Sequence, residues 1–242
     1  MDATSISAQE ALRGRLAAVR GRIEAAAARV GRDPASVRLV AVTKGHDAAA
    51  PRAALDAGCV DVGENYVQEL VAKMDALAAP NARWHLIGPL QRNKVKYVVG
   101  RVVLIHTVDS AALADALDAR AAALRVTQDV LCQVNVGEEP QKYGVPTGGL
   151  FPLLEHLRGK RHLRVVGLMT LPPFFDAPER VRPFFSALRG LQEGARTAFP
   201  ELPLGELSMG MSGDFEVAVE EGATLVRVGT TLFGARAPKG KD

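Results

Sequence analysis

Eight short apolar runs recur along the chain. The first, VRLVAVTK at residues 37–44, is continuous and rich in β-branched residues, which is typical of a strand buried on both faces of a parallel sheet. Similar runs follow at residues 60–63, 84–88, 102–109, 130–136, 165–170, 207–210 and 225–229. The pattern therefore predicts eight strands.

Stretches with helical spacing lie between most of these runs. Near the amino terminus, apolar residues alternate with arginines in a pattern that predicts one long amphipathic helix with a solvated basic face. Its apolar positions are Leu12, Leu16, Val19, Ile23 and Val30. Later stripes predict helices at residues 67–77, 113–124, 150–157 and 181–191. Ser110 and Ser212 stand at expected helix starts, and Gly222 stands at an expected helix end.

The alternation of strand and helix predicts an α/β fold. Eight parallel strands without a long polar linker fit one (β/α)8 barrel, or TIM barrel, over residues 1–242, with an extra helix at residues 1–32 packed on it. An open doubly wound sheet is the alternative. The even spacing of the apolar runs, and the lack of a Gly-x-Gly-x-x-Gly pattern after the first strand, favour the barrel.

Composition narrows the classes of function. The chain is 48% hydrophobic and 24% charged, which is typical of a globular protein. A net charge of +3 and an aromatic content of 5% argue against nucleic-acid binding. No apolar run approaches the roughly 18 residues of a membrane span, and the amino terminus does not resemble a signal peptide, so we expect a cytoplasmic protein.

Two cysteines, Cys59 and Cys132, each lie in an apolar run. Neither has a second Cys or a His at the spacing of metal ligands, so we expect buried thiols, with no disulfide and no metal site.

Polar residues stand where the predicted strands end, which is where barrels of this kind carry their chemistry. Lys44 ends the first strand, at the rim of an apolar barrel. Desolvation there favours an uncharged, nucleophilic amine suited to a Schiff base. Alternatively, Lys44 extends into solvent as a surface cation, and its position alone does not decide between the two.

The segment at residues 207–234 carries small and hydroxyl residues after the last two strands. Gly229 allows backbone N–H groups to approach an anion, and Ser208, Ser212 and Thr230 add hydroxyl donors. Phosphate groups bind barrels at this position. The alternative is that Gly229 only eases a turn and Ser212 only caps a helix. Together with Lys44, the segment favours a ligand that is an aldehyde carrying a phosphate.

Arg227 precedes Gly229 by two residues, so alternation along the strand points both toward the barrel mouth. An inward guanidinium needs a partner. One interpretation pairs it with an acid such as Glu64. If the ligand is pyridoxal phosphate, Arg227 could instead donate to the pyridine nitrogen, which would keep that nitrogen unprotonated and weaken the ring as an electron sink.

Several stretches together resemble the pyridoxal phosphate homeostasis proteins, whose barrel is similar to the N-terminal domain of alanine racemase. They are VAVTK (40–44), GENYVQE (63–69), WHLIGPLQRNK (84–94), HTVDS (106–110), QVNVGEEPQKYG (133–144), GLMTLPP (167–173) and the segment 207–236. Two departures lie near the site: a proline often found shortly after the lysine is missing from residues 45–47, and Gly213 replaces a frequent acid.

The resemblance implies a role for each candidate residue. Lys44 would hold pyridoxal 5'-phosphate as an internal aldimine, with Asn65 and His85 beside the ring and Arg227 facing its nitrogen. Ser208, Ser212, Gly229 and Thr230 would surround the phosphate, and Met169 and Met209 would complete the cofactor-binding set.

The predicted function is to buffer or deliver pyridoxal phosphate inside the cell with little or no turnover. The cofactor is the expected ligand of a monomer, with apo-enzymes that need it as transient acceptors. One alternative is a pyridoxal-phosphate-dependent amino-acid racemase, recognisable by proton exchange at the amino-acid Cα. Another is an aldolase that uses Lys44 without a cofactor, and it would be colourless.

Overall fold

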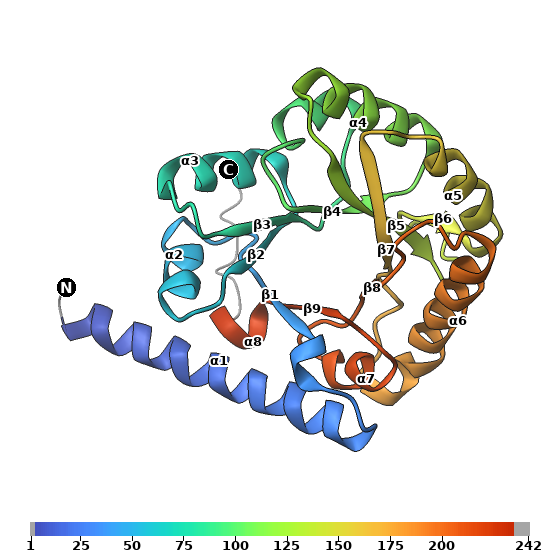
Figure 1. The fold of residues 1–242 in the computed structure, drawn as a ribbon. Coiled ribbons are helices and arrows are strands. Elements are labelled where there is room, and N and C mark those ends of the chain that lie inside the picture. Colours follow the sequence, from blue (N-terminus) through green and yellow to red (C-terminus); the bar gives the residue numbers. More distant parts are fainter. Residues whose placement is uncertain (1–2, 235–242) are drawn as a thin grey trace.

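A computed structural model describes residues 3–234, with side chains from residue 8 onward. Eight parallel strands in this part of the chain form a closed ring (Figure 1). They are β1 (Arg38–Val42), β2 (Asp61–Glu64), β3 (Arg83–Leu86), β4 (Leu104–Val108), β5 (Gln128–Asn135), β7 (Leu163–Met169), β8 (Glu206–Ser208) and β9 (Leu225–Val228). Pairing of β1 with β9 and of β4 with β5 closes the barrel. The predicted barrel and its eight strands are confirmed.

Helices surround the ring on its outer face (Figure 1). They are α2 (Ala49–Asp56), α3 (Val67–Leu77), α4 (Ala111–Leu124), α5 (Leu150–Arg158), α6 (Arg182–Ala198), α7 (Phe215–Glu220) and α8 (Thr230–Phe233). The four helices predicted from the apolar stripes are α3, α4, α5 and α6. The Ser110 side chain caps α4 as predicted, accepting the N–H of Leu113. Helix α2 was not predicted, and neither was a short strand, β6 (Val145–Pro146), which pairs with β5 outside the ring.

Apolar side chains divide between two cores. The larger core lies between the strands and the helices, as expected for strands buried on both faces. A smaller cluster contains Val40, Leu104, Leu131, Met169 and Leu225, which five different strands contribute. The rest of the barrel interior is unusually polar and contains His85, His106, Ser208 and Arg227.

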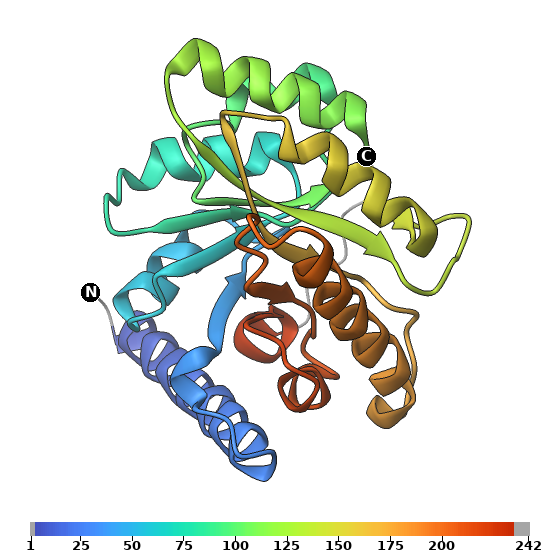
Figure 2. The same ribbon diagram turned by 45° about the vertical axis from the view of Figure 1, so that its right-hand side comes forward.

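The first helix, α1 (Ala3–Arg29), lies across the outside of the barrel against α7, α8 and α2 (Figures 1 and 2). The apolar side of α1 is buried against the barrel as predicted, with Leu12, Leu16, Val19 and Ile23 at the contact. Val30 is 45% exposed because the helix ends before it, so its inclusion in the stripe was wrong.

The arginines of this segment do more than face solvent. Arg15 Nε donates to the Leu232 carbonyl oxygen at 2.6 Å, and Arg22 and Arg29 pair with Glu216 and Glu220 of α7. The expectation of a merely solvated face was wrong, because the basic side chains reach the last elements of the chain.

Cys59 and Cys132 are buried free thiols, as predicted. Burial raises the pKa of Cys59 to about 11 and that of Cys132 to about 12. The described residues contain no cluster of His, Cys, Asp and Glu that could hold a metal ion. None of the helices in the same part of the chain is long and apolar enough to cross a membrane.

Candidate functional site

A cavity of about 260 Å³ opens at the carboxyl ends of the strands. Six of the residues predicted from sequence line it: Lys44, Asn65, Ser212, Arg227, Gly229 and Thr230. Val42, Ile87, Leu171, Phe174, Phe175, Met211, Gly213 and Asp214 complete the wall. A larger groove of about 450 Å³ lies between α1 and the amino ends of β1 and β2, and it contains none of the predicted site residues. The predicted site residues that line a cavity therefore lie together in the smaller one.

Lys44 is half-buried, and side chains of α3 hold the backbone on both sides of it. The buried Lys73 ammonium donates to the Thr43 carbonyl oxygen at 2.8 Å. On the other side, the N–H of Gly45 donates to Glu69 Oε2 at 2.9 Å. Helix α3 therefore fixes the path of the chain through Lys44.

Glu64 completes this support from the end of β2. Its carboxylate is fully buried, pairs with the Lys73 ammonium at 2.5 Å and accepts the hydroxyl of Thr43. Burial raises the Glu64 pKa, and the bonds from Lys73 and Thr43 oppose that rise without cancelling it. The interpretation that Glu64 pairs with Arg227 is therefore wrong, because Glu64 binds Lys73 on the side of the strand that α3 covers.

Ser212 lies beside the end of β9. Its hydroxyl oxygen accepts the N–H groups of Gly229 and Thr231, at 3.3 and 3.4 Å. Helix α7 begins only after Asp214, so the expectation that Ser212 caps it was wrong. Gly222 has a positive φ just past the helix end, where it was predicted. The hydroxyl of Ser212 thus joins two separate segments of the cavity wall.

Gly229 is close to the neighbouring strand. A Cβ at this position would lie 3.0 Å from the Val42 carbonyl oxygen and 3.3 Å from the Val42 Cβ. Glycine therefore lets β9 end tightly against β1, within the cavity wall that includes Lys44.

Arg227 is inward-facing, as predicted, and only 3% exposed. Its Nη1 donates to Ser208 Oγ at 2.6 Å and its Nη2 donates to the Thr170 carbonyl oxygen at 2.8 Å. Burial lowers the Arg227 pKa to about 10, and the charge of Asp214 works in the opposite direction. The guanidinium therefore stays charged at neutral pH, with a neutral hydroxyl and a carbonyl as its bonded partners.

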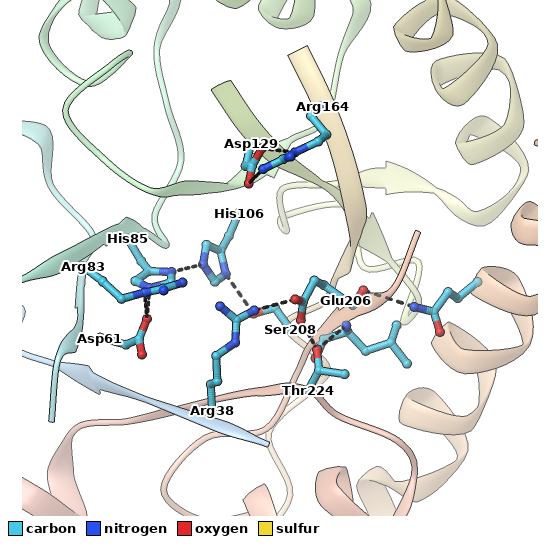
Figure 3. Close-up of polar contacts among 12 residues, drawn as sticks. Arg38, Asp61, Arg83, His85, His106, Asp129, Arg164, Glu206, Ser208 and Thr224 are labelled. Carbon is cyan, nitrogen blue, oxygen red and sulfur yellow. Dashed lines mark hydrogen bonds and ion pairs between the residues drawn. The ribbon is translucent and has the colours of Figure 1, made fainter. Parts of the chain in front are cut away.

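Four predicted residues do not line the cavity. His85 and Ser208 are fully buried in the barrel interior, where His85 bonds to Asp61 and His106 (Figure 3). Met169 packs in the interior apolar cluster. Met209 faces the outer core, because side chains alternate along the chain after Ser208. His85 is not part of the cavity wall, and its expected position beside a bound ring stays a prediction.

His106 and Asp61 were missed as members of this region. Both belong to strands that were predicted correctly, and alternation within those strands was the available signal. Burial lowers the pKa of His106 well below its usual value, and the nearby charges of His85, Arg227 and Arg38 add to this effect. Burial also lowers the His85 pKa, although the bond to Asp61 opposes the change.

These two histidines should make the fold sensitive to acid. An unfolded histidine binds a proton near pH 6.5, whereas the buried ones stay neutral to lower pH, so the unfolded state takes up more protons. We expect the free energy of unfolding to be highest above pH 6.5 and to fall below it, by up to about 1.4 kcal/mol per pH unit for each histidine. Urea denaturation between pH 5 and 8 measures this slope. His106→Gln should flatten it, and an unchanged slope would contradict the assignment.

Comparison with known proteins identifies the family. Residues 15–237 match the family described as "Alanine racemase, N-terminal domain". The pyridoxal phosphate homeostasis protein of Aquifex aeolicus is 46% identical, over 92% of this chain and 97% of its own length. Its counterpart from Pseudomonas aeruginosa is 42% identical, over 91% and 94%.

Solved structures agree with these relatives. The structure of PipY from Synechococcus elongatus with pyridoxal phosphate bound has a TM-score of 0.82 and 39% identity, and the match covers 92% of this chain and all of PipY. An alanine racemase from Clostridium difficile has a TM-score of 0.71 at 13% identity over 96% of this chain and 61% of its own, a likeness of fold alone. The chain therefore belongs to the pyridoxal phosphate homeostasis protein family.

Proposed function

We propose that this protein binds pyridoxal phosphate through the Nζ of Lys44 and holds it for delivery to other proteins. The barrel and its first helix act as one cofactor-binding domain, monomeric and cytoplasmic, and the acceptors are apo-enzymes that require the cofactor. The observation that carries the proposal is that one cavity brings together Lys44, the Ser212 and Gly229 segments and the Arg227 guanidinium.

The cavity residues fit this ligand at three points. Pyridoxal phosphate supplies an aldehyde that an amine can attack, an aromatic ring and a dianionic phosphate. Lys44 provides the amine. The long hydrogen bonds from Gly229 and Thr231 to Ser212 supply N–H donors that can turn to a phosphate, and the Thr230 hydroxyl adds another. Asn65, Ile87 and Leu171 provide a mixed polar and apolar surface for the ring.

Arg227 supports a carrier over an amino-acid enzyme. Its buried guanidinium carries only donors, so toward a pyridine nitrogen it can donate but cannot accept. A nitrogen that receives this bond stays unprotonated, and an unprotonated ring withdraws electrons from an attached amino acid poorly. Exchange of the bound aldehyde onto another lysine needs no such withdrawal.

The direct test is an absorption spectrum of the purified protein after incubation with pyridoxal phosphate and dialysis. We expect a visible band that borohydride removes, with the cofactor then fixed to the peptide that contains Lys44, as read by mass spectrometry. A cofactor-free aldolase would give no such band. Mixing the loaded protein with a separate apo-enzyme should restore the activity of that enzyme. Rapid deuterium exchange at the Cα of L-alanine, with formation of D-alanine, would overturn the carrier assignment in favour of a racemase.

The phosphate segments provide a graded prediction. Thr230→Ala should weaken binding of pyridoxal phosphate by about 0.5 to 3 kcal/mol, because one hydroxyl donor is lost while backbone donors remain. Gly229→Val should weaken binding more, because its side chain would press against Val42 and fill the approach to the backbone. Fluorescence titration measures both affinities.

The matched control is Gly205→Val, at an exposed glycine with open space around its Cβ position. It should bind the cofactor like the wild type. If Gly229→Val also binds like the wild type, this segment does not hold the phosphate.

A further inference from the structure

A continuous chain of buried hydrogen bonds crosses the barrel interior and ends at the cavity. Asp61 Oδ1 lies 2.8 Å from His85 Nε2, and His85 Nδ1 lies 3.0 Å from His106 Nε2. His106 Nδ1 lies 2.8 Å from Ser208 Oγ, which accepts Nη1 of Arg227. The five residues come from β2, β3, β4, β8 and β9, and Figure 3 shows the first three of the four links, from Asp61 to Ser208.

The chemistry of the end groups fixes the direction of every hydrogen bond. The ionised Asp61 carboxylate can only accept, so His85 carries a proton on Nε2. Burial keeps both histidines neutral, so His85 Nδ1 accepts from His106 Nε2. His106 Nδ1 then carries no proton and accepts the hydroxyl of Ser208, whose oxygen accepts from Arg227. Both histidines are therefore in the same neutral Nε2–H tautomer.

The far end of the chain is anchored. Asp61 also accepts Nε of Arg83 at 3.0 Å, which holds the carboxylate in its ionised form. Burial alone would raise the pKa of Asp61, but the His85 bond and the charges of Arg83 and Arg38 lower it overall. The histidines face Asp61, Arg83, Arg38 and Arg227, while each side chain between Asp61 and Arg227 is fully buried.

We propose that Asp61, His85, His106 and Ser208 act as positioning residues for Arg227, setting the orientation in which its guanidinium meets the cofactor ring. The inference rests on the proposed function for its ligand. Ser208 and the Thr170 carbonyl oxygen each take one N–H of the guanidinium, which leaves other N–H groups for the cavity that Arg227 lines.

Acid should reverse the direction of the hydrogen bonds between the histidines and Ser208. Once either histidine gains a second proton, His106 Nδ1 becomes a donor and can no longer accept the Ser208 hydroxyl. Ser208 must then accept from both His106 and Arg227, which places two positive groups on one oxygen. The orientation of Arg227 is thereby tied to a titration deep in the barrel.

The chain itself is tested on the unloaded protein by NMR of ¹⁵N-labelled histidine. Long-range ¹H–¹⁵N spectra distinguish the two neutral tautomers from the charged ring. We expect His85 and His106, assigned with His85→Gln and His106→Gln, to be neutral Nε2–H tautomers at pH 7. Ser208→Ala should change the His106 signals by removing their donor. An Nδ1–H tautomer or a charged ring at either position would overturn the proposal.

The effect on the cofactor is tested by titrating pyridoxal phosphate into the wild type and Ser208→Ala. We expect about 10-fold weaker binding in Ser208→Ala and a shifted absorption maximum, because the ring meets a differently oriented guanidinium. Ser208→Thr keeps the hydroxyl and should restore both values.

Gln192→Met is the matched control for lost stability. It removes a buried polar group that bonds the Leu204 carbonyl oxygen and takes no part in the chain. Gln192→Met should lower the melting temperature and leave the affinity for pyridoxal phosphate and the absorption maximum unchanged. Wild-type affinity and spectrum in Ser208→Ala would overturn the positioning role alone, whereas failure of the wild type to bind would overturn the proposed function. If Ser208→Ala does not fold, the tautomers of the wild type decide the matter.

Discussion

Replacing Lys44 by alanine is expected to give a folded protein that cannot be labelled with pyridoxal phosphate by borohydride. Lys44 is the lysine that lines the cavity with Arg227 and Gly229, and its amine is the group there that can attack an aldehyde. Its backbone is held by Lys73 and Glu69, which the substitution leaves in place. The measurements are the absorption spectrum of the dialysed protein, peptide mapping after reduction, and a thermal melt.

Two matched variants make this result specific. Lys44→Arg keeps the positive charge but lacks a reactive amine, so it too should remain colourless. Lys160→Ala removes a lysine that pairs with Asp115, far from the cavity in sequence, and should label like the wild type. A visible, borohydride-sensitive band of native strength in Lys44→Ala would show that another lysine carries the cofactor.

Gly167→Ala is expected to cost the largest share of stability among single methyl additions. A Cβ at residue 167 would lie 1.9 Å from the carbonyl oxygen of Glu206 and 2.6 Å from its carbonyl carbon. Both atoms belong to the backbone of β8, so the two strands must separate. We expect a loss of about 3 kcal/mol or more, the upper range for overpacking in a core. Urea denaturation measures it.

The control for Gly167→Ala is Gly190→Ala, inside α6, where nothing lies within 4 Å of the added Cβ. Alanine is the better helix former, so this variant should gain about 0.5 to 1 kcal/mol. Because Ser208 pairs with Met169 two positions beyond the Gly167 contact, Gly167→Ala should also weaken cofactor binding. Equal unfolding free energies for the two variants would contradict the close approach of β7 and β8.

The barrel could be predicted from sequence because strands buried on both faces are continuous apolar runs that stand out between helical stripes. The missed elements lack this signal. Helix α2 contains Pro51 and a run of alanines, and β6 has only two residues, one of them a proline. Helix α1 was predicted, but the partners of its arginines come from the other end of the chain.

The cavity could be predicted in outline because the carboxyl ends of parallel strands meet at one edge. The layer beneath it could not. Alternation shows which side chains of a strand share a face, but a strand that is apolar on both faces does not reveal which face points inward, so His85 was assigned to the cavity and His106 was overlooked. The prediction that Ser212 caps a helix was wrong for a related reason. A serine hydroxyl can cap a helix or accept a distant N–H, and only the folded position of Gly229 decides between the two.

The pairing of β1 with β9 also governs when the site can exist during synthesis. Val40 on β1 lies opposite Arg227 on β9, and Lys44 follows the first strand while Gly229 follows the last. A ribosome therefore releases Lys44 well before it releases Arg227 and Gly229. Until β9 emerges, β1 has an open edge, and α1 lacks the α7 and α8 surface that its arginines bind. A chain that stopped before β9 would carry Lys44 without Arg227, Gly229 and Thr230, so the complete cavity can form only after the last strand of the ring has been made.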